Sequence, residues 1–505
     1  MRRFGGATLS LLDAGVGKNV YMENASRRFP LTDEQRAAVA CQAKLIRVVA
    51  FAGAGKTTML VEFARARRAQ RFLYLAYNAS IQKEASKRFP PNVVARTSHS
   101  LAYEAIGHLY AAAGMLVSAN RMNTVMSVLD VDDWPMASAY AYANACMDTL
   151  NAYLCSDQDE MTAEMVPSIV CELSFPIKKV LESAQRVWSI MRDLGDTRLG
   201  MTHDGYLKLY QLSKPGLAGY DYILFDEAQD ANPVTAALVL SQDCGKVLVG
   251  DRHQQIYTFR GARDALDSFE PEETFYLTTS FRFGAAVAQA ANALLSYFKG
   301  ESHRVIGMKA GDRLGPVDTD RQYAIISRTN SGLFDEAVAA AQAGKKLFFV
   351  GGIDGYKFAS VADAYHLMTG DVASIRDPYL KSFKTFAQME EYAEVTDDKE
   401  AKMLCKVVGK YGNQIPQQLE RIYAADEKDQ GAADICLTTA HKSKGLEFEQ
   451  VRLADDFVDL VDKEGKLLPA DSVETEEINI LYVACTRAEC VLEAEVLKEI
   501  GASLG

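Results

Sequence analysis

The chain has 505 residues, of which 48% are hydrophobic and 24% are charged, and its formal net charge is −12 at pH 7. This length exceeds what a single small core needs, so we expect several domains. The sequence has no apolar run of about 18 residues, and it therefore predicts no membrane-spanning helix. The acidic balance argues against a protein whose whole surface coats nucleic acid, but it is compatible with a local basic groove.

The cysteines and the first residues indicate the cellular compartment. Nine cysteines are scattered along the chain without a C-x-x-C pair, which favours reduced thiols over a disulfide framework or a zinc site. The first 20 residues contain only a short apolar patch, which Asp13 interrupts, and such a patch is not typical of a secretory signal. We therefore expect a cytoplasmic protein, associated with the nucleoid if the host is prokaryotic.

The stretch LIRVVAFAGAGKTTML, which begins at Leu45, predicts a strand, a phosphate-binding loop and a helix in succession. Glycines in such a loop permit a tight backbone whose N–H groups face phosphate oxygens; Lys56 reaches the outer phosphates, and the Thr57 hydroxyl can ligate Mg²⁺. Taken alone, the loop indicates a nucleoside triphosphate such as ATP and is also compatible with a structural switch or a small-molecule kinase. Its predicted nucleotide-binding residues are Ala52, Gly53, Ala54, Gly55, Lys56, Thr57 and Thr58.

A pair of acids follows a second apolar strand in GYDYILFDEAQD. We expect Asp226 to hold Mg²⁺ together with Thr57, and Glu227 to orient and deprotonate the attacking water. An isolated pair of this kind would indicate a helix cap, but four apolar residues precede this one and require a buried strand. The pair therefore favours nucleotide hydrolysis.

The next strand leads into VLVGDRHQQIYTFRGA. Gln254 at its carboxyl end could sense the γ-phosphate, while Tyr257 and Phe259 offer flat faces beside Arg260. Aromatic faces next to cations hold single-stranded nucleic acid without sequence preference. The alternative is that Tyr257 belongs to the core.

The order of the motifs resembles the superfamily 1 helicases of the UvrD/Rep/PcrA type, from about residue 31 to residue 490. The segments MTHDGYLKLYQL (201–212) and FAQMEEYAE to GNQIP (386–416) resemble the F-box DNA helicases in particular. About 30 residues precede Leu31, too few for an F-box, so we expect no ubiquitin-ligase role. The motifs are LTDEQ (31–35), AGAGKTT, LAYN (75–78), TSHS (97–100), DEAQD, GDRHQQIYTFRGA, LTTSFR (277–282), TTAHKSKGLEFEQV (438–451) and LYVACTRAE.

The resemblance implies further roles in the nucleotide site. Gln35 would recognise the adenine edge, Phe281 would stack on adenine, and Glu447 would lie near the ribose and the γ-phosphate. Arg282 and Arg487 would be arginine fingers. Arg487 stands in the otherwise apolar and small stretch ILYVACTRAEC, where an unpaired charge would be costly to bury; the alternative is a surface arginine.

The resemblance also implies contacts with DNA. For His99 and His441, we give direct contact with DNA and an ordinary hydrogen-bonding role equal weight. The implied DNA-binding residues are Asn78, Thr97, His99, Ser100, Tyr257, Phe259, Arg260 and His441.

Strands that alternate with helices predict an α/β fold with two RecA-like P-loop NTPase motor domains, built on doubly wound parallel sheets, and two mainly helical insertions. In the first insertion we expect a helix between Pro176 and Gly195 with an apolar face of Ile177, Val180, Leu181, Ala184, Val187, Trp188 and Met191. The predicted boundaries are a leader at 1–30, the first motor domain at 31–110 and 205–275, its insertion at 111–204, the second motor domain at 276–360 and 431–505, and a reduced second insertion at 361–430.

The resemblance implies an ATP- and Mg²⁺-dependent motor that moves 3′-to-5′ along single-stranded DNA and unwinds duplex/single-strand junctions in repair or recombination. Because the second insertion is short for this family, one alternative is a translocase that strips proteins and unwinds little. Another is a nucleotide-gated, helicase-like subunit of a repair or phage-defence complex. Its protein partner would then be a nuclease or a recombination protein. We expect no membrane partner.

Overall fold

A computed structural model describes residues 30–131, 133–257, 264–396 and 398–497, and two six-stranded sheets organise it. The first sheet has the strand order β3-β2-β4-β5-β1-β6, and each neighbouring pair is parallel. β2 and β5 are buried along their whole length, as expected for strands with helices on both faces. The strands are β1 Leu45–Ala50, β2 Phe72–Ala76, β3 Val93–Thr97, β4 Tyr222–Phe225, β5 Gly245–Gly250 and β6 Glu273–Leu277.

The second sheet has the order β11-β12-β10-β13-β14-β9, again with parallel neighbours. Its strands are β9 Arg313–Leu314, β10 Tyr323–Ser327, β11 Leu347–Phe349, β12 Ile435–Thr439, β13 Phe448–Leu453 and β14 Ala488–Glu493. A short pair, β7 Thr279–Ser280 with β8 Ile306–Gly307, lies apart from both sheets. The predicted α/β class with two RecA-like units is confirmed.

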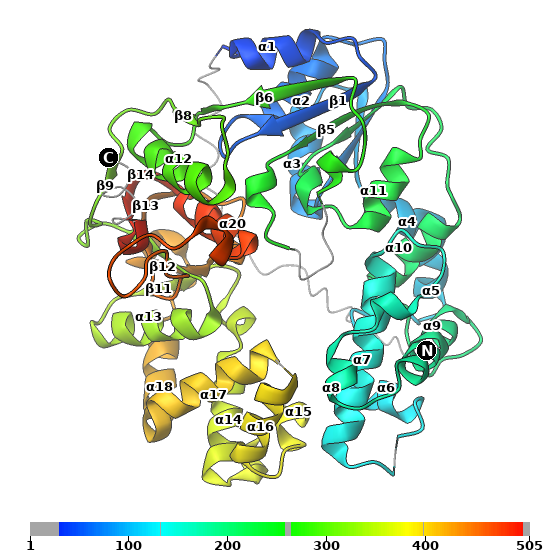
Figure 1. The fold of residues 1–505 in the computed structure, drawn as a ribbon, viewed down its shortest axis with the longest axis vertical. Coiled ribbons are helices and arrows are strands. Elements are labelled where there is room, and N and C mark those ends of the chain that lie inside the picture. The colour runs from blue at the N-terminus through cyan, green and yellow to red at the C-terminus, as the bar shows by residue number, and fades with distance from the viewer. Residues whose placement is uncertain (1–29, 132, 258–263, 397, 498–505) are drawn as a thin grey trace, which may run out of the picture.

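We refer to each sheet with its covering helices as the first and the second motor domain; their residue boundaries stay predictions. Figure 1 shows the first at the top and the second beside it, in green to red. The first includes α1 Asp33–Ala40, α2 Lys56–Arg65, α3 Ala79–Arg88 and α11 Pro233–Leu240. The second includes α12 Ala285–Lys299, α13 Asn330–Gln342, α19 Ala440–Ser443 and α20 Thr475–Cys485.

A helical insertion extends from the first motor domain. Its longest helix, α7, packs against α9, whose buried residues include Val180, Ala184, Val187 and Trp188. Ile177 departs from the predicted apolar face: it is 41% exposed because it is the first residue of α9 and extends past the packed part. The helices are α4 Ser98–Ala102, a π-helix at Tyr103–Gly107, α5 His108–Ala112, α6 Met122–Ser127, α7 Met136–Cys155, α8 Ile169–Glu172, α9 Ile177–Arg192 and α10 His203–Leu212.

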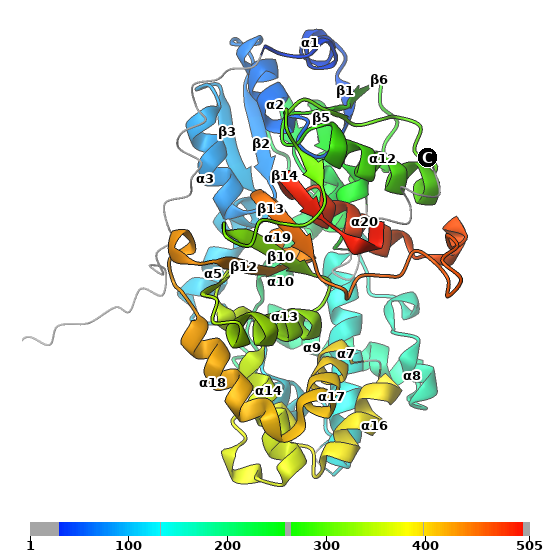
Figure 2. The same ribbon diagram turned by 90° about the vertical axis from the view of Figure 1, so that its left-hand side faces the viewer.

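A second helical insertion extends from the second motor domain and meets the first insertion at the end far from the sheets (Figures 1 and 2). The rings of Tyr140 and Tyr379 lie 5.2 Å apart, and Asn144 donates to the Tyr392 hydroxyl at 3.1 Å. Among the described residues, no helix combines the length and apolar character needed to cross a bilayer. This insertion comprises α14 Phe358–Thr369, α15 Pro378–Lys381, α16 Phe386–Thr396, α17 Lys399–Tyr411 and α18 Ile415–Ala425.

Candidate active site

A cleft of about 470 Å³ brings together residues of both motor domains that are far apart in the sequence. The carboxyl ends of β1, β4 and β5 supply one wall, and the segments around α19 and α20 supply the other. The predicted site residues in its lining are Gly53, Ala54, Gly55, Lys56, Thr57, Thr58, Asn78, Asp226, Glu227, Gln254, Tyr257, Arg282, Glu447 and Arg487.

The loop between β1 and α2 requires glycine at two positions. Gly53 and Gly55 both have φ of +74°, in the left-handed region that L side chains rarely adopt. A Cβ atom on Gly53 would lie 2.5 Å from the Ser280 hydroxyl and 2.7 Å from Cβ of Arg282. The loop therefore approaches the start of the second motor domain more closely than any side chain would allow.

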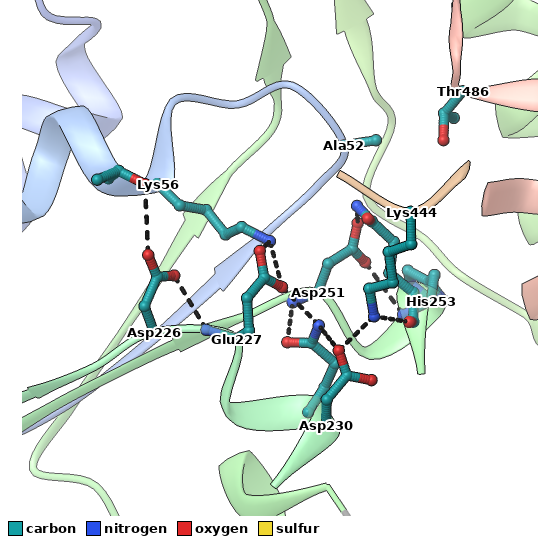
Figure 3. Close-up of polar contacts among 12 residues, drawn as sticks. Ala52, Lys56, Asp226, Glu227, Asp230, Asp251, His253, Lys444 and Thr486 are labelled. Atoms are coloured by element: carbon teal, nitrogen blue, oxygen red, sulfur yellow. Dashed lines mark hydrogen bonds and ion pairs between the residues drawn. The ribbon is translucent and has the colours of Figure 1, made fainter. Parts of the chain in front are cut away.

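The Lys56 ammonium contacts the Glu227 carboxylate at 2.9 Å (Figure 3). Burial opposes its charge, but Glu227 and Asp226 outweigh burial and raise the pKa of Lys56. Burial likewise works against the Glu227 charge, yet Lys56 and Lys444 lower the pKa of Glu227 to about 2. Glu227 has φ of +52°, and such strain in a non-glycine residue is characteristic of functional sites.

Asp226 is a buried carboxylate beside a second carboxylate. It accepts hydrogen bonds from the Tyr74 hydroxyl at 2.9 Å and the Thr57 hydroxyl at 3.3 Å. Burial, with the charge of Glu227, raises the pKa of Asp226. Two buried acids beside one lysine leave a negative charge that a divalent cation would offset, and a hydroxyl and a carboxylate are oxygen ligands that Mg²⁺ accepts. Thr57 and Asp226 therefore fit the predicted metal site.

The predicted adenine contacts lie next to the loop. Gln35 is buried; it donates to the Ala54 carbonyl at 3.0 Å and accepts from the Thr32 N–H at 3.1 Å, so its side chain holds the loop and the start of α1. The Phe281 N–H donates to the Gly53 carbonyl at 3.0 Å, and its ring lies 3.7 Å from where a Cβ on Gly55 would stand. Both residues border the loop, and their contact with adenine stays a prediction.

Arg282 of the second motor domain pairs with Glu447 at 2.7 Å and donates to the Thr486 carbonyl at 3.0 Å. Burial works against the Glu447 charge, but Arg282 outweighs it and lowers the pKa of that carboxyl. The guanidinium is thereby fixed in the second motor domain, while Cβ and the backbone of Arg282 lie next to Gly53 at the cleft.

Arg487 is 1% exposed, which excludes the alternative of a surface arginine. Its guanidinium donates to the Val483 carbonyl at 2.8 Å, the Leu446 carbonyl at 3.3 Å and the Gln254 side-chain oxygen at 3.5 Å. Burial, with repulsion from Arg282, lowers the pKa of Arg487 to about 9. The second motor domain thus places a buried cation directly against Gln254 of the first.

Several residues of the site received no role from the sequence. Asp251 accepts from the Gln254 amide at 2.6 Å, and Lys444 donates to the Gln254 carbonyl at 2.5 Å and pairs with Asp230. Burial raises the pKa of Asp230 to about 6 despite the nearby Lys444. Asp230 and Lys444 stand inside the motifs DEAQD and TTAHKSKGLEFEQV. Their position as charged residues within these motifs was the sequence feature that could have assigned them to the site.

Three aromatic rings lie together at the border between the motor domains. Tyr77 and Tyr257 stack with centroids 6.0 Å apart, and the His441 ring lies 6.0 Å from Tyr257. Tyr257 donates to the His441 carbonyl at 3.2 Å, and His441 contacts the Ile256 carbonyl at 3.1 Å. Burial lowers the pKa of His441. Tyr257 therefore joins the two domains; it is also partly buried and packs against the hydrophobic core, so both the predicted DNA contact and the core alternative stay open.

The remaining predicted DNA contacts lie at the starts of α3 and α4. Asn78 caps α3 by accepting from the Ile81 N–H at 2.9 Å, and Thr97 caps α4 in a reciprocal arrangement with Ser100. His99 pairs with Asp204 at 3.1 Å. Contacts with DNA at these positions stay predictions. Phe259 and Arg260 lie outside the described residues.

Comparison with known proteins gives the family. The family model of the UvrD/REP helicase N-terminal domain matches residues 31–270, and that of the UvrD-like helicase C-terminal domain matches residues 383–493. The chain belongs to the UvrD-like helicases. F-box DNA helicase 1 of Gallus gallus is 33% identical to this chain, over 92% of this chain and 48% of the relative's length. F-box DNA helicase protein 1 of Schizosaccharomyces pombe is 32% identical, over 91% of this chain and 56% of the relative's length. DNA helicase II of Escherichia coli is 27% identical over 52% of this chain and 40% of its own length.

The chain thus spans about half the length of the curated relatives it matches. The predicted family and the predicted likeness to F-box DNA helicases are confirmed. In this UvrD-like helicase, the two matched regions supply the two walls of the cleft: Lys56, Asp226 and Glu227 fall in the first, and Glu447 and Arg487 in the second.

Tyr482 ties the two walls of this UvrD-like helicase together. Its fully buried hydroxyl accepts the Ala52 N–H at 3.1 Å and donates to Asp251 at 3.3 Å. We expect Tyr482→Phe to lower kcat for ATP hydrolysis about 5- to 30-fold, with KM for ATP little changed, because one or two hydrogen bonds of about 1 kcal/mol that position Gln254 through Asp251 are lost. Steady-state ATPase assays measure both constants.

Tyr356→Phe is the matched control, since Tyr356 is also fully buried in the second motor domain but its hydroxyl donates to groups of that same domain, the carbonyls of Val350 and Leu437. A purely structural role for Tyr482 would lower the melting temperature of both variants alike and leave kcat of the active fraction unchanged.

Proposed function

We propose that this UvrD-like helicase hydrolyses ATP between its motor domains and couples hydrolysis to movement along single-stranded DNA and to duplex separation. The observation that carries the proposal is the contact of Arg487 with Gln254, which completes the site of the first motor domain with a cation from the second. When a site is split in this way, opening and closing of the domains assembles and disassembles the catalytic groups.

Binding of the triphosphate rearranges Lys56. In the structure its ammonium neutralises Glu227, and the phosphates of a bound triphosphate would offer it a larger negative charge. Once Lys56 turns to the phosphates, Glu227 is free to accept a proton from the attacking water. Gln229, which donates to Glu227 at 2.7 Å, keeps the carboxylate in place during this exchange.

The charge that develops on the transferred phosphoryl group is stabilised by cations from the opposite wall. Arg282 and Arg487 both face the cleft, and arginine fingers contribute about 10³ to 10⁵ in rate. Thr57 and Asp226 would hold Mg²⁺, which would supply positive charge next to the phosphates. Phosphoryl transfer in this site is therefore mainly a matter of position and electrostatics.

The cluster of Tyr77, Tyr257 and His441 supports a single-strand path along the border between the domains. Stacking on rings and contacts with phosphates give little sequence specificity, so we propose single strands and duplex/single-strand junctions as substrates. The relatives named DNA helicases support DNA as the nucleic acid. The family resemblance supports a 3′-to-5′ polarity. We also propose a role in repair or recombination, with a nuclease or a recombination protein as partner.

The test is the rate of ATP hydrolysis with and without single-stranded DNA, for the wild type and for Tyr257→Ala. We expect strong stimulation in the wild type. In the variant, the half-saturating DNA concentration should rise about 5- to 150-fold, which corresponds to one stacking contact of about 1 to 3 kcal/mol.

An ATPase that hydrolyses normally and does not respond to DNA would contradict the motor. The same ATP hydrolysis assay with single-stranded RNA in place of DNA measures whether the protein prefers deoxyribose or ribose in the strand.

A second function is favoured by the compact second insertion, which the five helices α14 to α18 form. A translocase with so small an insertion could displace bound proteins while unwinding little. Strand separation on a tailed duplex, compared with displacement of a protein bound to a single strand, discriminates between the two.

A further inference from the structure

Apart from the nucleotide cleft, a second pocket of about 650 Å³ lies where the first motor domain meets its helical insertion. It is lined by residues of β3, of the rod formed by α4, the π-helix and α5, and of the start of α10. Figure 1 shows α4, α5 and α10 close to one another. The pocket lining includes Arg96, His99, Tyr103, Glu104, His108 and Tyr206. We propose that this pocket receives one unpaired nucleobase of the DNA strand, an inference that rests on the proposed function.

The backbone is built to present an aromatic ring here. The π-helix at Tyr103–Gly107 interrupts an otherwise α-helical rod, and such wide turns are frequent at functional sites. Gly107 makes room for the rings: a Cβ atom would stand 2.9 Å from the Tyr103 ring and 3.1 Å from the Tyr206 ring. Any side chain at this position would displace at least one tyrosine.

One side of the Tyr103 ring packs against Tyr206, and the side chain is partly exposed to solvent. The buried Tyr206 ring packs against it edge to face at a centroid distance of 6.1 Å, whereas Tyr103 itself is 41% exposed. The His99 ring also packs edge to face on Tyr206, at 6.2 Å, and its side chain is 41% exposed. A fixed aromatic face that remains in contact with solvent is the arrangement on which nucleobases stack.

The charges of the pocket favour a base over a phosphate. Arg96 pairs with Glu104, and His99 contacts Asp204 at 3.1 Å, so the one arginine and one of the two histidines in the lining each have a carboxylate partner, while His108 contacts the Tyr103 carbonyl at 3.3 Å. Phosphate binding requires an excess of positive charge, which this arrangement does not provide. The same groups offer both donors and acceptors along the rim, which suit the edge of a base.

The pocket contains two of the predicted DNA contacts. Ser100, one of the implied DNA contacts, is part of its lining, and His99 is another. A strand whose backbone passes Thr97 and Ser100 can therefore place a base against Tyr103.

The test uses a duplex with a single-stranded 3′ tail, which fixes the register of the protein, and removes one tail base at a time. Binding is measured without ATP by fluorescence anisotropy. In the wild type, one abasic position should weaken binding about 5-fold or more. In Tyr103→Ala that position-specific loss should disappear, whereas Tyr103→Phe, which keeps the ring, should retain it. Gly107→Ala should weaken binding to the intact tail.

Leu109→Ala is the matched control, since Leu109 is 47% exposed on the same rod and is not part of the lining. Tight binding by the wild type with no sensitive position, or with the same sensitive position in Tyr103→Ala, would overturn the pocket and leave the motor intact. Failure of the wild type to bind any tail would overturn both proposals. Circular dichroism of each variant verifies that its helices are intact.

Discussion

Arg487→Ala is expected to lower kcat for ATP hydrolysis about 10³- to 10⁵-fold, because the cation that completes the split site is removed. Its guanidinium is the group of the second motor domain that contacts the Gln254 side chain, at 3.5 Å. Nucleotide affinity should change far less, since Lys56 and the loop around it belong to the other wall. Single-turnover hydrolysis, together with binding of a fluorescent ATP analogue, separates the two effects.

The side chain is also buried and donates to two backbone carbonyls, so its removal costs stability as well. Arg328→Ala is the matched control: Arg328 forms a two-pronged ion pair with Glu477 at 2.6 and 2.8 Å in the same domain, and it does not line the cleft. Arg487→Lys retains the charge without the planar fork and should recover only part of the rate. Normal hydrolysis by Arg487→Ala would rule out the split-site mechanism.

Glu227→Gln is expected to lower kcat about 10²- to 10⁴-fold, the usual contribution of a general base. The amide has nearly the same shape but accepts no proton from water at neutral pH. ATP binding should be retained or tightened, because Lys56 would no longer be held by a carboxylate. Equilibrium binding of ATP and the rate of phosphate release measure the two parts of this prediction.

Glu62→Gln provides the comparison, since Glu62 is a carboxylate of α2 paired with Arg65 and lies outside the cleft. If Glu227→Gln lost affinity for ATP and kept its kcat, Glu227 would be a binding residue, and the base would have to be found elsewhere in the cleft.

The sequence by itself determined the parts of the site that are contiguous in the chain. The strand, loop and helix around Lys56 are specified by apolar and glycine patterns within about 20 residues, and the acid pair follows directly from a four-residue buried strand. The order of the motifs was sufficient for the family and the α/β class. Local backbone chemistry alone fixes such features, so no distant partner is needed to recognise them.

Only the tertiary structure decided which groups face one another. The bonds of Tyr482 with Ala52 and Asp251 join residues more than 200 positions apart, and no local pattern marks a tyrosine as a link between two walls. Lys444 and Asp230, which are also far apart in the sequence, form an ion pair only in the folded chain. The hydroxyl of Thr97 caps the start of α4. Sequence fixes what each group can do, but burial and distance fix its charge state and its partner, and both arise only when separate segments pack together.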